Sequence, residues 1–545
     1  MHDARQRGLA ARAGPWLWLS PLLFMALTGS YLIARYNGQW AEADSATFTK
    51  IIRAFTEDGG LAPEFGPVYP NGYLFQAISS FILGLTGIDV VTLQQVLYPL
   101  LSLLIVLPAW VLYRELTESA LGATLATVLL CSQPELLFMI LRSSHEKFTR
   151  ILMLLCLYIL VRSFRHRDQP WQLAAHVGLF YLLFFSLAGS NNLIAHSFIF
   201  AIVIAILLGR LLERRTNNEL DREAGVFSRF LYIVLIALAL VYLFIFYVYP
   251  PAQHDLLVLE SVTDRIIALL VDMRITGGSG ATNAYLQVQN GWVSLPVYLL
   301  VSIANWIILG ISFAIVCYQG VRWLGWGDAP KTLQARLLWL FYVAFSVQGV
   351  LSILSDASGA LGSNLQHRLF PSFSIMAVAV VGGALSRWSP PSQALWPRSQ
   401  ALWLSGLTGL IRFAVAASIS VIAILSILKA TNEPLVSNKW TFYRPAEMAA
   451  LVWTDAHLVG SPVWTEFDER LVVAYDMAKG DSDHGNLFQG YGARTTTRTR
   501  VVTEVARLRA DRLDLTLPLP PDAFRVYDNG AAEVYHLRPE TPYQP

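Results

Sequence analysis

The sequence predicts a mainly α-helical, polytopic transmembrane bundle with about eleven spans and a small α/β domain at its C-terminal end. Of its 545 residues, 54% are hydrophobic and 14% are charged, whereas soluble domains average about 25% charged residues. The mean hydropathy is +0.47. Apolar runs of about 20 residues recur, the length that a helix needs to cross a hydrocarbon layer of about 30 Å. These observations exclude a single water-soluble globule.

The apolar windows define the predicted spans. They cover residues 15–35, 92–113, 119–140, 149–163, 171–188, 193–212, 228–249, 293–317, 335–354, 369–386 and 405–428. The stretch from Tyr73 to Gly87 is also apolar, but it is short and lies between turn residues. We therefore expect it to form a re-entrant or interfacial helix.

The distribution of Arg and Lys predicts the orientation in the membrane. Arg5, Arg7 and Arg12 precede the first apolar stretch, no small-residue cleavage pattern follows it, and later positive residues gather in alternate loops. Because positive loops stay cytoplasmic, we expect a retained first span and a cytoplasmic N-terminus. An odd number of spans then places the C-terminal segment outside, in a multi-pass protein of the plasma membrane.

Two regions follow from this layout. Residues 1–430 form the expected membrane domain, with long outer loops at 37–72 and 250–292, and residues 431–545 form a soluble extracytoplasmic α/β domain. In that domain we expect helices at 444–458 and 468–478, a strand at 462–466, a loop at 480–499, and a hairpin of 524–527 with 532–537.

Charge and cysteine content exclude several classes of function. The formal net charge is +2 and no basic stripe occurs, which gives no indication of a nucleic-acid partner. Cys131, Cys156 and Cys317 all lie in apolar runs without a ligand-like spacing. This pattern excludes a disulfide scaffold and a structural zinc site.

The first candidate site is Glu42-Ala43-Asp44, just beyond the first span. In an extended loop the two carboxylates would point to similar sides, where they could share a cation or divide the work of orienting an acceptor and taking its proton. The alternative is a solvated loop with no chemical role. An amphipathic helix is expected to follow, from Ala46 to Thr56.

Two further polar clusters lie at the predicted outer face. One contains His145, Glu146 and Lys147, with Arg150 a helical turn later, and the other is Gln366-His367-Arg368 ahead of the tenth span. Lys offers a point charge to phosphate and Arg a two-pronged fork. The alternatives are a solvated turn for the first cluster and an arginine that extends to the lipid headgroups for the second. Asn191-Asn192 is interpreted as a plain turn.

The order of elements after Asp44 resembles the GT-C membrane glycosyltransferases. The amphipathic helix is followed by Gly59-Gly60, by a Pro67–Tyr73 element that contains Tyr69-Pro70, and by the apolar segment that ends at Gly87. The superfamily includes protein O-mannosyltransferases, lipid A aminoarabinose transferases and oligosaccharyltransferase catalytic subunits. The resemblance covers residues 15–165 well and the rest in layout.

The resemblance implies roles for these residues. The first-loop acid, here Asp44, would be the catalytic base or a metal ligand, and Glu146 would be the second acid. Lys147, Arg150, His367 and Arg368 would bind the donor phosphate, and Tyr69 and His145 would belong to a substrate loop. Because the first acid is Glu42, a strict DxD motif is absent. A divalent metal, Mg²⁺ or Mn²⁺, held by Glu42 and Asp44 is an alternative to a reaction without a cofactor.

The implied activity is glycosyl transfer at the extracytoplasmic face. The donor would be a polyprenyl-phosphate-linked sugar, since no nucleotide is supplied there, and the acceptor a hydroxyl of a glycan, lipid or protein. Asp44 would act as the base in an inverting reaction. The alternatives are an O-antigen ligase or polymerase type of enzyme and a non-enzymatic lipid or polysaccharide transporter or sensor.

Overall fold

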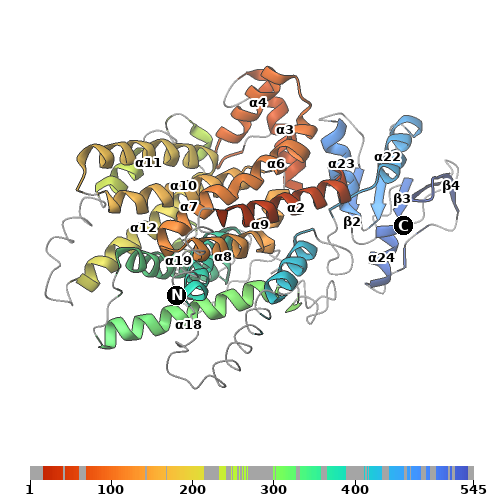
Figure 1. Cartoon of the computed structure of the whole chain (residues 1–545). Coiled ribbons are helices and arrows are strands. Elements are labelled where there is room, and N and C mark those ends of the chain that lie inside the picture. The colour runs from red at the N-terminus through yellow and green to blue at the C-terminus, as the bar shows by residue number, and fades with distance from the viewer. Residues whose placement is uncertain are drawn as a thin grey trace.

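The computed structural model describes most of the bundle and of the C-terminal segment (Figure 1). The described residues are 16–40, 43–59, 69–141, 144–166, 168–213, 232–240, 249–253, 302–326, 332–357, 365–387, 417–431, 441–458, 463–466, 468–479, 487–490, 499–512 and 522–537, with a few isolated positions. Most of the predicted loop 250–292, including its expected surface helix, lies outside them.

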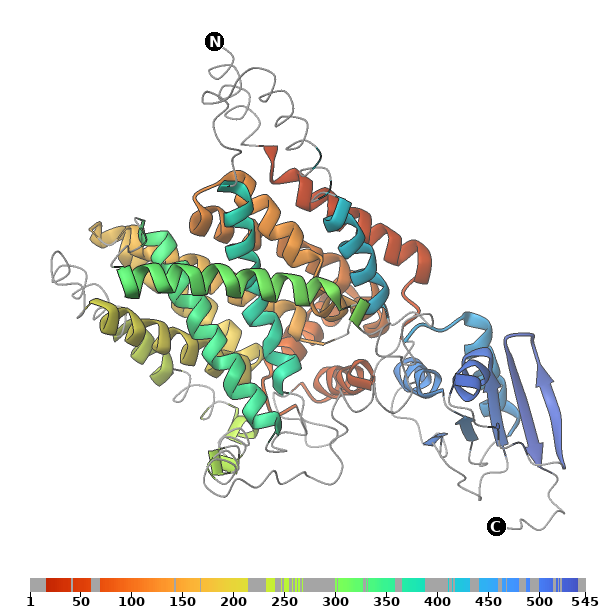
Figure 2. The same ribbon diagram turned by 90° about the horizontal axis from the view of Figure 1, so that it is seen from below.

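Helices dominate the first four hundred residues. They are α2 (Leu19–Tyr36), α3 (Ala43–Asp58), α4 (Leu74–Thr86), α5 (Val90–Thr92), η2 (Leu93–Leu97), α6 (Tyr98–Ser102), η3 (Leu103–Ile105), α7 (Val106–Thr117), α8 (Ala120–Cys131), α9 (Pro134–Leu141), α10 (Glu146–Arg165), α11 (Pro170–Ser190), α12 (Asn192–Glu213), η5 (Pro250–Gln253), α18 (Ile303–Trp326), α19 (Leu333–Ala357) and α20 (Leu365–Arg387). Figure 2 shows α18 running across α19 and α20.

Six described helices are long and apolar enough to cross a membrane. They cover Val90–Thr117, Pro170–Ser190, Asn192–Leu212, Asn305–Trp326, Leu333–Ser355 and Arg368–Arg387. All six overlap predicted spans. Helices α2 and α10 occupy two more predicted windows, and a short apolar helix, Ala417–Ala430, lies in the last one. The segment predicted to be re-entrant or interfacial is α4, an apolar helix of 13 residues.

The predicted span 119–140 differs from a single straight crossing. It consists of α8 and α9, which meet at a 68° bend. Pro134 starts the second helix and cannot donate a backbone hydrogen bond to the preceding turn, so the first helix ends at Cys131. The bend leads the chain toward the cluster around His145.

A π-helical turn interrupts the long helix from Val90 to Thr117. The turn, η2, contains two buried glutamines. Gln94 donates to the hydroxyl of Thr49 in α3 at 2.8 Å, and Gln95 donates to the carbonyl of Trp40 at 2.6 Å. Such turns are frequent at functional sites. This one holds the chain on both sides of Asp44, at Trp40 and at Thr49.

The C-terminal segment contains a five-stranded sheet with the order β2-β1-β3-β5-β4. Its elements are α22 (Pro445–His457), β1 (Val463–Glu466), α23 (Glu469–Lys479), β2 (Leu487–Gly490), β3 (Thr499–Thr503), α24 (Glu504–Arg512), β4 (Ala523–Asp528) and β5 (Ala532–Leu537). Strands β1, β2 and β3 are parallel, whereas β5 is antiparallel to β3 and β4. The two helices, the first strand and the hairpin lie where the sequence predicts them.

One expectation for this segment is wrong. The sequence predicts a loop over residues 480–499, but Leu487–Gly490 is strand β2, parallel to β1. The pairing follows from topology, since β1, α23 and β2 make one βαβ unit. Unlike β1, β2 contains no β-branched residue and ends in glycine, so its sequence carries little strand signal.

A buried ionic cluster joins α22, the start of α23 and the end of β3. Arg470 donates to Asp468 at 2.9 Å and to Glu447 at 2.5 Å, and all three side chains are at most 3% exposed. Thr503, at the end of β3, donates to Asp468 at 2.5 Å. Arg470 also donates to the backbone carbonyl of Phe442, at the start of the C-terminal segment.

The C-terminal segment packs on α2 and α3 of the bundle. Phe442 stacks on Tyr36 with ring centroids 3.3 Å apart, and the amide of Tyr443 donates to the carbonyl of Gln39 at 3.0 Å. From α3, Arg53 donates to the carbonyl of Met477 in α23 at 2.8 Å. Both figures show α23 beside α3. The helix that carries Asp44 is therefore held from two sides.

We expect Arg470→Met to destabilise the C-terminal segment by about 3–5 kcal/mol, because it leaves two buried carboxylates without their cation. Thermal unfolding and limited proteolysis of the purified protein would show the loss. The matched control is Arg525→Met, which removes an exposed pair with Asp528 and should cost less than about 1 kcal/mol. Equal stability of the two variants would contradict this account.

Candidate functional site

Two turns that are distant in the sequence pair through their backbones. The amide of Asn192 donates to the carbonyl of Asn71, and the amide of Tyr73 donates to the carbonyl of Gly189, both at 2.8 Å. Gly72 lies between these bonds, where an added Cβ would come within 2.5 Å of the Gly189 carbonyl oxygen. The turn between α11 and α12 is therefore joined to the loop that carries Tyr69.

His145 lies at the centre of a polar network beside this pairing. Asn191 Oδ1 accepts from the amide of Ile194 at 3.0 Å, so its amide nitrogen faces His145, 2.5 Å from Nε2. An amide NH₂ can only donate, and Nε2 therefore accepts. The hydroxyl of Tyr69 lies 3.2 Å from the same nitrogen and receives a bond from Asn71 at 3.2 Å. The neutral ring carries its proton on Nδ1.

Asp44 lies in the first turn of α3 rather than in an extended loop, which corrects the sequence expectation. A carboxylate there is stabilised by the helix dipole. Phe48, one turn later on the same face, packs against the rings of Tyr69 and His145, with centroids 4.9 and 5.1 Å away. This places the Asp44 face of α3 toward the network.

One charged residue from each of the three clusters shifts the pKa of Tyr69. Burial is the main cause that raises the pKa of its phenol, and the charges of Glu146 and Asp44 raise this pKa further. The hydrogen bond from Asn71 and the charge of Arg368 lower it. One charged residue from each of three sequence-distant clusters therefore influences the phenol of Tyr69.

The two basic residues at the start of α10 are buried. Lys147 is 2% exposed, and its Nζ has no hydrogen-bond partner among the residues that the structure describes. Arg150 is 1% exposed and donates to the backbone carbonyl of Arg368 and to the hydroxyl of Ser372. Arg150 therefore holds the start of α20, while Lys147 presents a buried donor.

Helix α20 carries Arg368 in its first turn. The side chain of Arg368 is exposed, and Pro371 follows inside the helix. Pro371 cannot donate a backbone hydrogen bond to the carbonyl of His367, and Arg150 bonds the next carbonyl, that of Arg368, from outside the helix. Glu42 and the side chain of His367 lie outside the described residues.

No cluster of three or more His, Cys, Asp or Glu side chains able to hold a metal occurs among the described residues. Glu42, one of the two predicted ligands, lies outside them. A metal on Glu42 and Asp44 therefore stays a prediction. Carboxylate oxygens are the donors that Mg²⁺ and Mn²⁺ prefer, so the chemistry of this set fits either ion.

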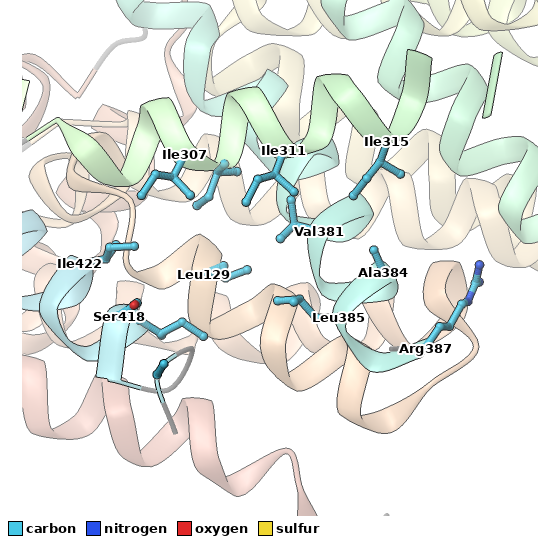
Figure 3. Close-up of a pocket in the computed structure, with 13 residues that line it drawn as sticks. Leu129, Ile307, Ile311, Ile315, Val381, Ala384, Leu385, Arg387, Ser418 and Ile422 are labelled. Carbon is cyan, nitrogen blue, oxygen red and sulfur yellow. The ribbon is translucent and has the colours of Figure 1, made fainter. Parts of the chain in front are cut away.

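A separate apolar cavity of about 670 Å³ lies at the opposite end of α20 from Arg368, and Figure 3 shows residues that line it. It is bounded by α8, α18, the end of α20 and the helix Ala417–Ala430. Ile311, Val381 and Leu385 are among its apolar lining residues, and Arg387 is the one charged residue among the lining residues that the structure describes. Its surface suits a hydrocarbon chain rather than polar chemistry.

Sequence reasoning missed Asn191. The sequence indicates a plain turn at Asn191-Asn192, but Asn191 fixes the tautomer of His145, and Asn192 pairs with Asn71. The available signal was a pair of asparagines between two apolar helices. A turn that is only exposed to solvent does not require two side-chain amides. The pairing itself leaves no trace in the sequence.

The fold is similar to that of solved membrane glycosyltransferases of the kind that the sequence resemblance names. One solved structure with this architecture is the archaeal oligosaccharyltransferase AglB from Archaeoglobus fulgidus, in complex with an inhibitory peptide and a dolichol-phosphate. It is 12% identical, with a TM-score of 0.55 over 97% of this chain and 75% of its own. Another is ArnT from Cupriavidus metallidurans in the apo state, 13% identical, with a TM-score of 0.51 over 95% and 97% of the two chains.

Comparisons at the level of sequence find no relative. No family model matches the chain, and a search of curated proteins finds no match. The similarity is therefore one of fold.

We expect Gly72→Ala to break the pairing of the two turns and to destabilise the protein by about 1–3 kcal/mol, because the new methyl group would meet backbone atoms that cannot move aside freely. Melting temperature and protease sensitivity of the loop are the measurements. The control is Gly84→Ala in α4, where nothing lies within 4 Å of the added Cβ and stability should hold or rise. A Gly72→Ala protein as stable as this control would refute the steric argument.

Proposed function

We propose that the protein is a membrane glycosyltransferase that moves a sugar from a polyprenyl-phosphate-linked donor to an acceptor hydroxyl. The observation that carries this proposal is the contact of Tyr69 with His145, next to Glu146, and with Phe48 of the helix that bears Asp44, together with the influence of Asp44, Glu146 and Arg368 on its phenol. Two acids and a cation at one place are what deprotonation of an acceptor and departure of a phosphate require.

The donor phosphate is assigned to Lys147 and Arg368. Lys147 supplies a buried ammonium group whose donors have no partner in the described part of the chain, and Arg368 supplies an exposed fork in the first turn of α20. Arg150 takes a supporting place, since its guanidinium is bonded to the α20 backbone. His367, next to Arg368, is a further candidate for the phosphate.

In the proposed reaction Asp44 takes the proton of the acceptor hydroxyl as its oxygen attacks the anomeric carbon. The bond between that carbon and the phosphate oxygen breaks, and polyprenyl phosphate leaves with the electron pair. Attack from the face opposite the phosphate inverts the anomeric centre. Glu146 orients the acceptor. Cations at the phosphate stabilise the charge that develops there, and electrostatic stabilisation of this kind supplies most of the rate enhancement in many enzymes.

A divalent metal is the alternative within the same site. Glu42, Asp44 and Glu146 would hold Mg²⁺ or Mn²⁺, which would polarise the acceptor or the phosphate. Chelation with EDTA, followed by addition of either ion, separates the two versions of the reaction.

The solved neighbours support a lipid-linked donor. AglB is described in complex with a dolichol-phosphate, a polyprenyl phosphate, and we propose a donor of this class for the present chain. The apolar cavity on α20 offers space for part of an isoprenoid chain. Arg368 and Leu385 are 17 residues apart, about 25 Å along a helix, a span that a long isoprenoid chain can bridge.

The proposal places the site on the extracytoplasmic side, with the N-terminus in the cytoplasm, as the distribution of Arg and Lys predicts. The C-terminal segment, residues 431–545, is proposed as an extracytoplasmic domain. Its contacts with α3 support a role in holding the helix of the base.

We expect Asp44→Asn to lower sugar transfer by about 10²- to 10⁴-fold, the usual contribution of a general base, while the protein stays folded. The assay follows transfer from a polyprenyl-linked sugar in membranes. Asp58→Asn, an exposed acid at the other end of α3, is the control and should keep full activity. Retained transfer in Asp44→Asn at normal expression would remove Asp44 from the mechanism.

Removal of either proposed phosphate ligand should weaken donor binding. We expect Lys147→Met and Arg368→Gln each to reduce affinity for undecaprenyl phosphate by about tenfold or more, because a hydrogen bond to a charged group contributes about 1.5–3 kcal/mol. Arg114→Gln, at the exposed end of α7, is the control. Unchanged binding in both variants would assign the phosphate to other residues.

A further inference from the structure

Asn192 is a buried amide without a structural role for its side chain among the described residues. It is 0% exposed, and neither Nδ2 nor Oδ1 has a hydrogen-bond partner in the part of the chain that the structure describes. Leaving a buried polar group unpaired costs about 1–3 kcal/mol. Native structures rarely retain such a cost without a partner that arrives later.

The position of Asn192 is fixed by its backbone. Its amide donates to the carbonyl of Asn71 at 2.8 Å, and the preceding residue, Asn191, contacts the ring of His145. The side chain therefore belongs to the same rigid junction as Tyr69. A helix of 22 residues follows and anchors this turn.

A second buried group with unpaired donors lies close in the chain to the same network. Lys147, two residues beyond His145, is 2% exposed, and its ammonium has no partner among the described residues. An ammonium suits an anion, whereas an uncharged amide, with two donors and an acceptor, suits hydroxyl groups. A ligand that satisfies both has a phosphate at one end and sugar hydroxyls next to it.

We infer that Asn192 binds hydroxyl groups of the sugar that is transferred and so contributes to the choice of sugar. The inference rests on the proposed function, because it assumes a phosphate-linked sugar at Lys147. Asn192 donates to one hydroxyl oxygen and accepts from a hydroxyl proton. A site built to bond a hydroxyl rejects a ligand that lacks it, since the buried group is then left unpaired.

The inference separates two contributions to donor binding. Lys147 contributes to the binding of every polyprenyl phosphate, whether or not the lipid carries a sugar. Asn192 contributes only when the sugar is present. A merely structural role for Asn192 would change the affinities for both lipids together or change neither.

The experiment measures binding of two kinds of probe to the purified full chain in nanodiscs. One probe is bare undecaprenyl phosphate, and the others are undecaprenyl phosphates that carry a single glucose, mannose, galactose or arabinose. The variants are Asn192→Ala, Asn192→Ser and Lys147→Met. Asn305→Ala is the control, because Asn305 is already bonded to Glu135 at 2.6 Å in another part of the bundle.

The wild type should bind at least one sugar-bearing lipid about 5- to 150-fold more tightly than the bare lipid. Asn192→Ala should remove this preference, a loss of about 5- to 150-fold for 1–3 kcal/mol, and should leave the affinity for the bare lipid unchanged. Lys147→Met should weaken both by the same factor, and Asn305→Ala neither. Asn192→Ser, which keeps a small polar group, serves if the alanine variant does not fold.

Three outcomes would overturn the inference. In the first, the wild type shows no preference for any sugar-bearing lipid. In the second, the Asn192 variants keep the preference. In the third, the Asn192 variants bind the bare lipid and the sugar-bearing lipids more weakly by the same factor. Failure of the proposed function looks different, because the wild type would then bind none of these lipids. Melting temperatures recorded with each variant separate loss of binding from loss of fold.

Discussion

The site depends on the backbone pairing between residues 71–73 and residues 189–192. Two hydrogen bonds of 2.8 Å, with a glycine between them that leaves no space for a side chain, join a loop to a turn more than a hundred residues later. Backbone bonds are stiff and independent of side-chain type. Through this junction Tyr69 and Asn191 both contact His145. The charges of Asp44, Glu146 and Arg368 influence Tyr69.

A second constraint acts from the C-terminal segment. Helix α3 packs on α4 inside the bundle and on α23 outside it, and η2 bonds to its middle through Gln94. The buried cluster of Arg470, Glu447 and Asp468 keeps the start of this segment, at Phe442, in place against α2. Ionic groups buried in this way are expensive to separate and so define one arrangement.

Apolar length predicts the main part of the fold, because a stretch such as 193–212 has few alternatives to a buried or spanning helix. The three candidate clusters are also visible in the sequence, since acids and cations between apolar helices are conspicuous. The proline at position 134 indicates the bend, whereas the hydropathy does not, because the apolar stretch continues on both sides of Pro134. The sequence expectation places Asp44 in a loop, although an acid just ahead of an amphipathic helix is a signal for a helix start.

The features that the sequence could not predict are tertiary. Strand β2 contains no β-branched residue and ends in glycine, and the pairing at Asn71 and Asn192 uses only backbone atoms. The role of Asn191 depends on which way its amide faces, a choice set by the amide of Ile194. Such features arise when distant segments meet, and a window along one chain does not contain them.

The double packing of α3 has a consequence for evolution and for engineering. Ala46 on this helix lies in one apolar cluster with Ala474 and Met477 of α23, so the two segments form a matched surface. Exchange of the C-terminal segment between distant homologues would pair surfaces that did not diverge together. A viable chimera would need residues 43–58 and the C-terminal segment from the same parent. Helix α3, which bears Asp44, and the segment that packs on it are therefore expected to be inherited together.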